Sequence, residues 1–134
     1  MNSTDELTYT SAQLHDKIVE SSRDIKFACI INDSGNVLCT FNENYLNMND
    51  AKKKMFFMEA ALQTKMNKDF DNELGEFKYT VTERKDGDKC VSAPLSSNEM
   101  IFVLMNKNED HNSFVKDTIN TSYLSGKSSL LNNQ

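Results

Sequence analysis

Apolar positions recur with a helical period in some parts of this chain and with a period of two in others. Near the start, Leu14 and Ile18 lie four residues apart, directly after Thr10-Ser11-Ala12-Gln13. That segment reads as a capping box, in which Thr10 caps the helix and Gln13 reaches back to the cap's backbone N–H. The pattern predicts a short amphipathic helix over residues 11–22.

The next segment alternates strictly. Apolar side chains at every second position from Ile25 to Ile31 predict a strand with one strongly apolar face. Asp33-Ser34-Gly35 predicts a three-residue hairpin loop, because glycine accepts the positive φ that closes such a loop. The resulting pairs are all apolar: Ile31 with Val37, Cys29 with Cys39, and Phe27 with Phe41. A two-residue loop would oppose apolar to polar residues, so the pattern favours the longer loop.

A long central helix is predicted over residues 49–70, capped either by Asn49 or by Asn47 together with Asp50. Four large apolar residues form one stripe along it: Met55, Met58, Leu62 and Met66. Four further residues widen that apolar surface: Phe57, Ala60, Ala61 and Thr64. The helix therefore has more apolar surface than one face of a sheet needs.

The second half of the chain is mostly β. Alternation predicts a third strand over residues 77–82, a hairpin at Asp86-Gly87, and a fourth strand that ends near Pro94. The unbroken apolar run from Met100 to Met105 predicts a central strand covered on both faces. A last helix is predicted to start at Asn108, with Glu109 and Asp110 in its first turn. The pairs Phe114/Val115, Thr118/Ile119 and Ser122/Tyr123 recur at helical spacing, and Gly126 is expected to end the helix.

Composition limits the number of domains, the cellular location and the class of partner. A chain of 134 residues with 38% apolar and 26% charged residues is typical of one globular domain, which we place at residues 11–125. Residues 1–10 and 126–134 are expected to be flexible. No stretch has the length of a membrane span or the layout of a signal peptide, which predicts a cytoplasmic protein without membrane insertion. A net charge of -5 argues against a nucleic-acid partner.

The predicted element order is α-β-β-α-β-β-β-α, with a tight Asp-x-Gly hairpin first and the apolar strand Met100–Met105 last. This order resembles the Roadblock/dynein light-chain-like domains, which are profilin-like, and small uncharacterised archaeal proteins of that plan. The resemblance implies an α+β fold with a five-stranded antiparallel sheet in the order 2-1-5-4-3. It also implies the central helix on one face and the terminal helices on the other. Many such domains dimerise through the central helix and third strand, and several are platforms for small GTPases.

The excess apolar surface predicts a homodimer interface on the central helix, at Met55, Phe56, Phe57, Met58 and Leu62. Adjacent residues point about 100° apart on a helix, so one sheet face does not easily cover both Phe56 and Phe57. The alternative is that the rest of the core covers these side chains. Beside this surface, Lys52-Lys53-Lys54 opens the helix, either as a patch for an anion, an acidic partner or a membrane surface, or as a solvated helix end.

The sequence offers few residues for catalysis, redox chemistry or metal binding. Cys29 and Cys39 are predicted cross-strand neighbours, either as a redox pair or as two small core residues. His15 and His111 have no nucleophile or carboxylate beside them in any recognisable motif, and the cysteine spacing fits no metal site. We therefore expect no enzyme activity, no metal and no cofactor. The predicted function is a regulatory scaffold that self-associates and docks another protein, such as a small GTPase or signalling partner. The alternative is a PAS- or profilin-like sensor of a small ligand.

Overall fold

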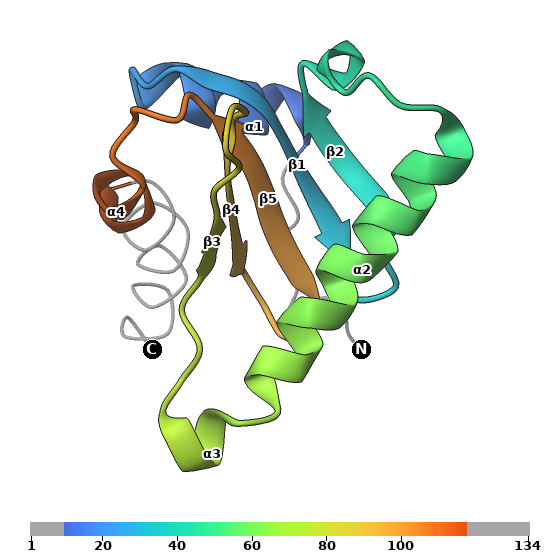
Figure 1. Ribbon diagram of the computed structural model, residues 1–134, viewed down its shortest axis with the longest axis vertical. Coiled ribbons are helices and arrows are strands. Elements are labelled where there is room, and N and C mark those ends of the chain that lie inside the picture. The colour runs from blue at the N-terminus through green and yellow to red at the C-terminus, as the bar shows by residue number, and fades with distance from the viewer. Residues whose placement is uncertain (1–9, 118–134) are drawn as a thin grey trace.

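The computed structural model describes residues 10–117, which form a five-stranded antiparallel sheet with helices on both faces. The elements are α1 (Ser11–Glu20), β1 (Ile25–Asn32), β2 (Val37–Phe41), a 3-10 turn (Glu43–Tyr45), α2 (Asp50–Lys68), α3 (Asp71–Leu74), β3 (Thr80–Thr82), β4 (Lys89–Pro94), β5 (Glu99–Met105) and α4 (His111–Phe114). The strand order is β2-β1-β5-β4-β3, as predicted (Figure 1). The expected flexible segments lie outside the described residues, apart from Thr10.

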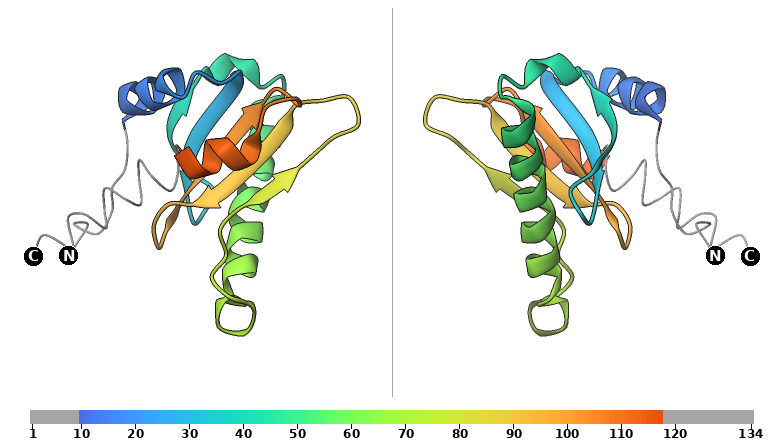
Figure 2. Two further views of the ribbon diagram at one scale, coloured as in Figure 1. Left: turned by 90° about the vertical axis from the view of Figure 1, so that its left-hand side faces the viewer. Right: turned by 90° about the vertical axis from the view of Figure 1, so that its right-hand side faces the viewer.

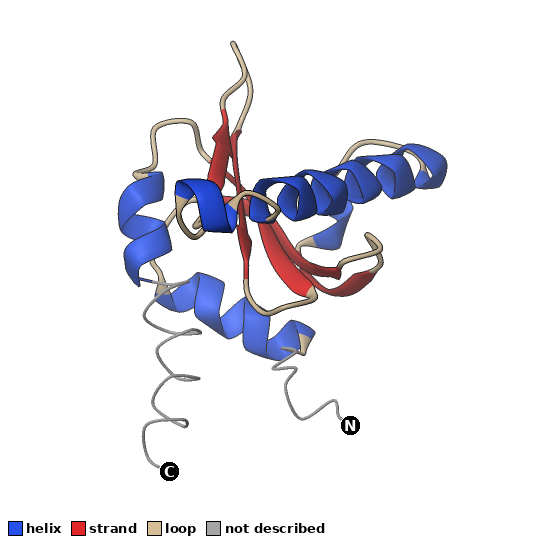
Figure 3. Cartoon of the chain, turned by 90° about the horizontal axis from the view of Figure 1, so that it is seen from below, coloured by secondary structure: helices blue, strands red, loops and turns tan. Residues whose placement is uncertain are grey.

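Two separate cores lie on the two faces of the sheet. On one face, α2 packs Phe57 and Ala61 against the sheet. On the other face, α1 contributes Leu14 and Ile18, and the α4 region contributes Phe114. Figures 2 and 3 show α2 on the side of the sheet opposite to α1 and α4. The layered arrangement implied by the resemblance is therefore confirmed.

β5 is the central strand of the sheet and β1 lies beside it, and both strands are buried on both faces. In β5, Met100 and Phe102 belong to the α2-side core, whereas Ile101 and Val103 belong to the opposite core. The unbroken apolar run thus serves two cores at once, as predicted for a central strand. β1 behaves similarly, except that the pairing with β5 is irregular between Ile25 and Phe27. Ile25 consequently lies in the α1-side core, and the prediction that it shares a face with Phe27 is wrong.

The first hairpin has the predicted loop but not the predicted register. The Asn32 and Asn36 backbones bond at 3.0 Å around a loop of residues 33–35, and Ile31 pairs with Val37 as expected. A β-bulge follows: Ile30 pairs with Cys39, which leaves Leu38 as an extra residue on β2. The bulge shifts the remaining pairs by one residue, so Cys29 faces Thr40 and Phe41 faces Ala28. The predicted pairs Cys29–Cys39 and Phe27–Phe41 are therefore wrong.

The cap of α1 was predicted, and the cap of α2 is one of the two alternatives that the sequence offered. The Thr10 hydroxyl accepts from the Gln13 backbone at 3.2 Å, and the Gln13 side chain accepts from the Thr10 backbone at 2.8 Å. The Asn49 side chain accepts from the Lys52 backbone at 2.8 Å and caps α2. α1 ends two residues earlier than predicted, at Glu20. Each cap satisfies a backbone donor that would otherwise lack an intrahelical partner.

The C-terminal half differs in detail. β3 has only three residues, Thr80–Thr82, because the preceding segment leaves the sheet, and α3 was not predicted at all. α4 is capped by Asp110, which accepts from the Ser113 backbone at 3.1 Å; the predicted cap, Asn108, lies in the preceding turn. The predicted helical signals beyond residue 117 lie outside the described residues.

A polar cluster holds the start of α4 against the sheet. Lys89 is almost completely buried in β4, and its ammonium group donates to the Glu109 carbonyl at 2.6 Å. The Glu109 carboxylate accepts from the Asp24 backbone at 3.0 Å, before β1. Arg23 donates to the Ser113 hydroxyl and to Asp117. The Glu109 carbonyl, together with the His111 Nδ1 at 3.2 Å, gives the buried ammonium group of Lys89 polar partners, and the remaining bonds fix the segment that carries them.

Candidate functional site

The inner face of α2 is well packed. Phe57, Ala61 and Thr64 are buried, and the Thr64 hydroxyl donates to the Met100 sulfur at 3.1 Å. The Phe57 ring lies 6.3 Å from Phe27 and 6.1 Å from Phe102, measured between ring centroids. Aromatic and small residues together anchor the helix to the sheet through one narrow strip. Phe57 therefore belongs to the core, and its assignment to the interface is wrong.

The outer face of α2 carries four large apolar residues. We call Met55, Met58, Leu62 and Met66 the outer stripe; their exposed fractions are 55%, 51%, 55% and 54%. Completely burying one side chain of this size is worth about 1.5–3 kcal/mol, so the monomer leaves considerable stabilising free energy unused. Three of the five predicted interface residues, Met55, Met58 and Leu62, lie on this stripe.

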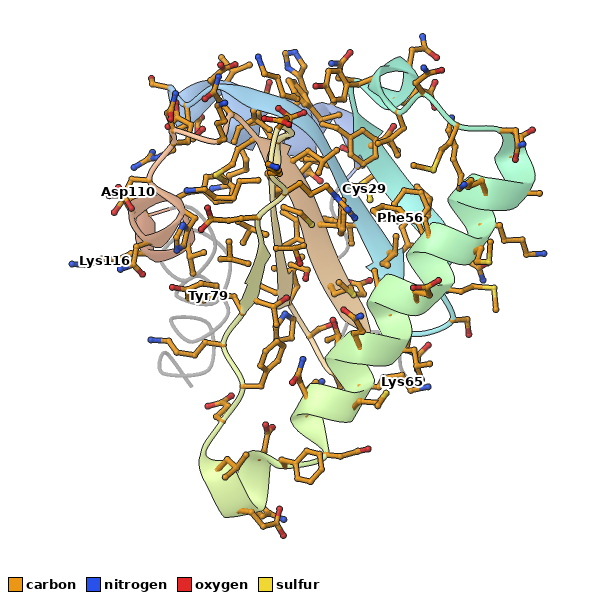
Figure 4. The ribbon with its side chains drawn as sticks, viewed as in Figure 1. Cys29, Phe56, Lys65, Tyr79, Asp110 and Lys116 are labelled. Carbon is orange, nitrogen blue, oxygen red and sulfur yellow. The ribbon has the colours of Figure 1, made fainter. Side chains whose placement is uncertain are left out.

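Phe56 lies between the two faces. Its ring is half-buried and makes an edge contact with Phe102 at 5.0 Å, and Figure 4 shows it between α2 and the sheet. The sheet thus accommodates both adjacent phenylalanines, because Phe56 and Phe57 pack edge to face at 5.3 Å. The argument that one sheet face cannot cover both is wrong, although the outer stripe remains exposed.

The stripe continues past the end of α2. Phe70 and Leu74 are 55% and 82% exposed, and both belong to the turn and short helix that follow. Figure 2 shows α3 at the end of α2 that extends beyond the sheet. Sequence analysis missed these two residues, although their spacing of four continues the spacing from Leu62 through Met66. The exposed apolar surface is therefore longer than the predicted one.

The β1–β2 turn is pressed against this helix at Gly35. A Cβ atom added there would lie 2.8 Å from the Met58 Cα, and Gly35 has a φ of +86°. Only glycine suits both the backbone conformation and the close approach. The turn and the outer stripe together border a shallow groove of about 670 Å³, whose polar wall includes Asp33 and Ser34. Gly35 thus fixes the position of the groove relative to the stripe.

A second groove lies on the other flank of α2, between the helix, the segment before it and the β3–β4 hairpin. Its volume is about 420 Å³, and Leu46, Phe56 and Leu104 give it an apolar lining. Lys52 and Arg84 supply positive charge there, and Glu59 and Asp88 supply negative charge. The neighbouring Tyr45 hydroxyl donates to Asp88 at 2.5 Å, and this bond raises the pKa of Tyr45.

The three lysines at the start of α2 differ in their exposure to solvent. Lys52 and Lys54 are exposed, whereas Lys53 is half-buried. Among the described residues, the ion pairs are His15–Asp16, Arg23–Asp117 and Lys26–Asp24, and none involves this run. Lysines in the first turns of a helix are disfavoured by its macrodipole. Their charge is therefore available to a partner outside the described chain.

The predicted redox pair is wrong. Cys29 lies in the core under α2, whereas the bulge turns Cys39 into the core on the other face. Burial raises the pKa of both thiols, and it raises the pKa of Cys90 to about 12. Because the thiolate is the reactive form, the raised pKa disfavours reaction at each of the three thiols. Cys29 and Cys39 act as small core residues, the other of the two interpretations given for them above.

The histidines do not form a catalytic arrangement with each other. His15 is an exposed residue on α1, with its ring 5.5 Å from Phe41. His111 lies at the start of α4, where its Nδ1 is 3.2 Å from the Lys89 ammonium group. Within residues 10–117, no three histidine, cysteine or acidic side chains are grouped as a metal site. No helix in the same part of the chain is long and apolar enough to cross a membrane.

No protein-family model matches the sequence, and no curated protein matches it. Solved structures do match. MglB from Myxococcus xanthus aligns with 96% of this chain and 99% of its own, at 11% identity and a TM-score of 0.66. A Roadblock/LC7 domain from Streptomyces avermitilis aligns over 81% and 87% of the two chains, at 13% identity and a TM-score of 0.59.

Profilin II from Acanthamoeba castellanii aligns over 90% of this chain and 99% of its own, at 14% identity and a TM-score of 0.55. At these identities the comparisons concern the fold. The chain has the Roadblock/LC7-like, profilin-like fold that the sequence resemblance implied.

Proposed function

We propose that this protein is a non-enzymatic regulatory scaffold that self-associates through the outer face of α2 and docks another protein. The observation that carries this proposal is the outer stripe, in which four large apolar side chains are each more than half exposed. An apolar row of this kind, bordered by charged residues, is typical of a protein–protein interface. The inner face of the same helix is already occupied by the sheet, so a partner has to approach from outside.

The Roadblock-like fold supports this assignment and suggests the class of partner. One of the structural neighbours is described as MglB with a tetrameric arrangement, which is a case of assembly on this fold. For the second partner we propose a small GTPase, the class implied by the family resemblance. Titration calorimetry with purified small GTPases, each loaded with GDP or a GTP analogue, measures that binding; no heat change with any of them would contradict this partner class.

The experiment that tests self-association is light scattering after gel filtration, over a range of concentrations. We expect a mass near twice the chain mass of 15.3 kDa. Met58→Asp buries an unpaired charge in the interface and is expected to weaken dimerisation by roughly a hundredfold or more. Circular dichroism should remain unchanged, because Met58 is 51% exposed in the monomer.

Val19→Asp is the matched control, because Val19 is a 58% exposed apolar residue on α1, on the other side of the sheet. This variant is expected to keep the dimer mass. A wild-type monomer at every concentration would contradict the proposal. Equal loss of the dimer in both variants would also contradict it, because the effect would then not depend on the outer stripe.

The second groove favours one other function, the binding of a small ligand. Its volume of about 420 Å³ and its lining by Leu46, Phe56 and Leu104 fit a small apolar molecule, with Lys52 or Arg84 available for an anionic group. A sensor would gain thermal stability from its ligand, by about 2.7 kcal/mol at a ligand concentration of 100 Kd. A metabolite library screened by thermal shift tests this reading, and Arg84→Ala should then reduce any shift caused by an anionic compound.

A further inference from the structure

The methionines of this chain differ sharply in their exposure to solvent. Six of the seven lie within the described residues. The three on the outer stripe, Met55, Met58 and Met66, are each more than half exposed. Met100 and Met105 in β5, by contrast, are 2% and 0% exposed. The methionines that are exposed in the described part of the chain therefore form one row along α2, on the side that the sheet does not cover.

The thioether sulfur of an exposed methionine is open to oxidation by a hydroperoxide. One peroxide oxygen is transferred to the sulfur as the O–O bond breaks; the sulfur loses two electrons, and the other oxygen leaves as hydroxide and is protonated to water. The product, methionine sulfoxide, is polar and accepts hydrogen bonds, whereas the thioether is apolar. A thiol-dependent methionine sulfoxide reductase reverses the change, because two thiols become a disulfide and the oxygen leaves as water.

The three cysteines are poorer targets for the same oxidant. Cys29 and Cys39 are buried and Cys90 is half-buried, and burial raises the pKa of all three thiols. Peroxide reacts with the thiolate, which a raised pKa disfavours. A thioether has no proton to lose, so its oxidation depends mainly on the access of the oxidant to the sulfur. Oxidation of this protein is therefore expected first at the exposed methionines.

The buried methionines are protected by the packing around β5. Met100 lies in the α2-side core, where its sulfur also accepts from the Thr64 hydroxyl at 3.1 Å, and Met105 lies in the opposite core. An oxygen atom added to either sulfur has to displace close-packed core atoms. The structure thus separates a row of sulfurs that an oxidant reaches in the folded chain from two that it reaches only when the chain opens.

From this distribution we infer that Met55, Met58 and Met66 form a reversible modification site, at which oxidation to sulfoxides by a hydroperoxide prevents self-association. The inference rests on the proposed function and adds its regulation. A sulfoxide oxygen buried between two apolar surfaces lacks a hydrogen-bond donor, which opposes assembly. In the dissociated chain the same oxygen is hydrated. Oxidation therefore stabilises the separate chains relative to the assembled ones.

Assembly and oxidation oppose each other in both directions. A stripe that is covered by a partner is shielded from peroxide, so oxidation proceeds through the dissociated chain. The rate constant for oxidation of Met58 should therefore fall as the protein concentration, and with it the dimer fraction, increases. A sulfoxide formed in the dissociated chain in turn lowers the fraction that reassembles. Peroxide thus changes the assembly state until a reductase restores the thioethers.

Peptide mapping by mass spectrometry during treatment with hydrogen peroxide tests the site. At a protein concentration that keeps the chains dissociated, we expect Met55, Met58 and Met66 to be oxidised roughly tenfold or more faster than Met100 and Met105. Light scattering of the oxidised protein should show dimerisation weakened by roughly a hundredfold. Treatment with methionine sulfoxide reductases A and B and dithiothreitol should restore the dimer, and circular dichroism should remain unchanged throughout.

The matched variant is Met55→Leu/Met58→Leu/Met66→Leu, which keeps apolar side chains of similar volume and removes every sulfur from the stripe. It should dimerise nearly as strongly as wild type and should keep its dimer in peroxide. Met48→Leu, at a half-buried position outside α2, is the control and should remain as sensitive to peroxide as wild type.

Two results would overturn the site itself: oxidation of Met58 and Met100 at equal rates, or loss of the dimer when the triple leucine variant is treated with peroxide. A dimer that persists with all three sulfoxides, in a chain whose Met58→Asp variant is monomeric, would overturn the regulation and leave the proposed function standing. A wild-type monomer at every concentration would overturn both.

Discussion

α1 and α2 are both amphipathic, and they use their apolar residues in opposite ways. In α1 the periodic residues Leu14 and Ile18 are 1% and 3% exposed, so the stripe visible in the sequence is the buried one. In α2 the most regular stripe faces outward, and the sheet is covered by Phe57 and Ala61 instead. A helical period therefore shows that a helix has an apolar face, but it does not show whether that face is covered by its own chain.

The two faces of α2 also differ in the size and flexibility of their side chains. The sheet-facing strip of α2 includes two small residues, Ala61 and Thr64, which allow the helix to lie close to β5. The outward strip has the flexible side chains Met55, Met58 and Met66. Methionine is common at binding surfaces because its unbranched chain adapts to a partner. This difference in side-chain size and flexibility suggests that the inner face of α2 packs in one fixed arrangement on the sheet, whereas the outer face binds a partner.

The largest expected effect on stability comes from truncating a side chain on the buried face of α2. Phe57→Ala removes a ring that is 5% exposed and should lower the free energy of unfolding by about 3–5 kcal/mol. Leu62→Ala removes a side chain that is 55% exposed and should change it by less than about 1 kcal/mol. Both are measured by urea unfolding in the Met58→Asp background, so that dimerisation does not contribute. Equal losses would mean that the outer stripe is packed within the monomer.

A somewhat smaller loss is expected where the hairpin turn meets α2. Gly35→Ala places a Cβ 2.8 Å from the Met58 Cα at a φ of +86°, which combines backbone strain with a clash against helix backbone. We expect a cost of about 2–4 kcal/mol from these two causes. Ser34→Ala, at the neighbouring exposed position, is the control. If thermal denaturation shows Gly35→Ala to be as stable as the control, the turn does not fix the groove.

The smallest effect is expected at the cap of α1. Thr10→Ala removes the hydroxyl that accepts from the Gln13 backbone, and should cost about 1 kcal/mol. Thr10→Ser keeps an accepting oxygen and should restore most of that loss. Chemical denaturation of the three proteins measures the difference. A loss in Thr10→Ser equal to that in Thr10→Ala would show that the hydroxyl does not act as the cap.

Much of the fold could be predicted because local signals agree with it. The capping box at Thr10, the cap at Asn49 and the turn that ends at Gly35 depend on neighbouring residues, so the sequence contains the whole interaction. The apolar run Met100–Met105 likewise required burial on both faces, which only a central strand provides. α3 escaped prediction because four residues give too little periodicity for a helix signal.

The site was predicted in part, and its errors have tertiary causes. A single bulge on β2 separated Cys29 from Cys39, because one extra residue turns every later side chain to the opposite face. Which face of α2 the sheet would cover depended on the shapes of β1 and β5, so Phe57 could not be distinguished from Met58 by period alone. Phe70 and Leu74 join the exposed surface only through the geometry of the chain after α2.

The sequence by itself determined the order of the strands and the longer helices, the caps of α1 and α2, the first hairpin loop and the presence of an excess apolar surface on the central helix. These features depend on contacts within a few residues of each other or on the total amount of apolar surface. The tertiary structure decided the register of the first hairpin, the division of the cysteines between two cores and the outward orientation of the methionine-rich stripe. Those outcomes depend on how sheet and helix fit together, because packing is settled between elements that are distant in the chain.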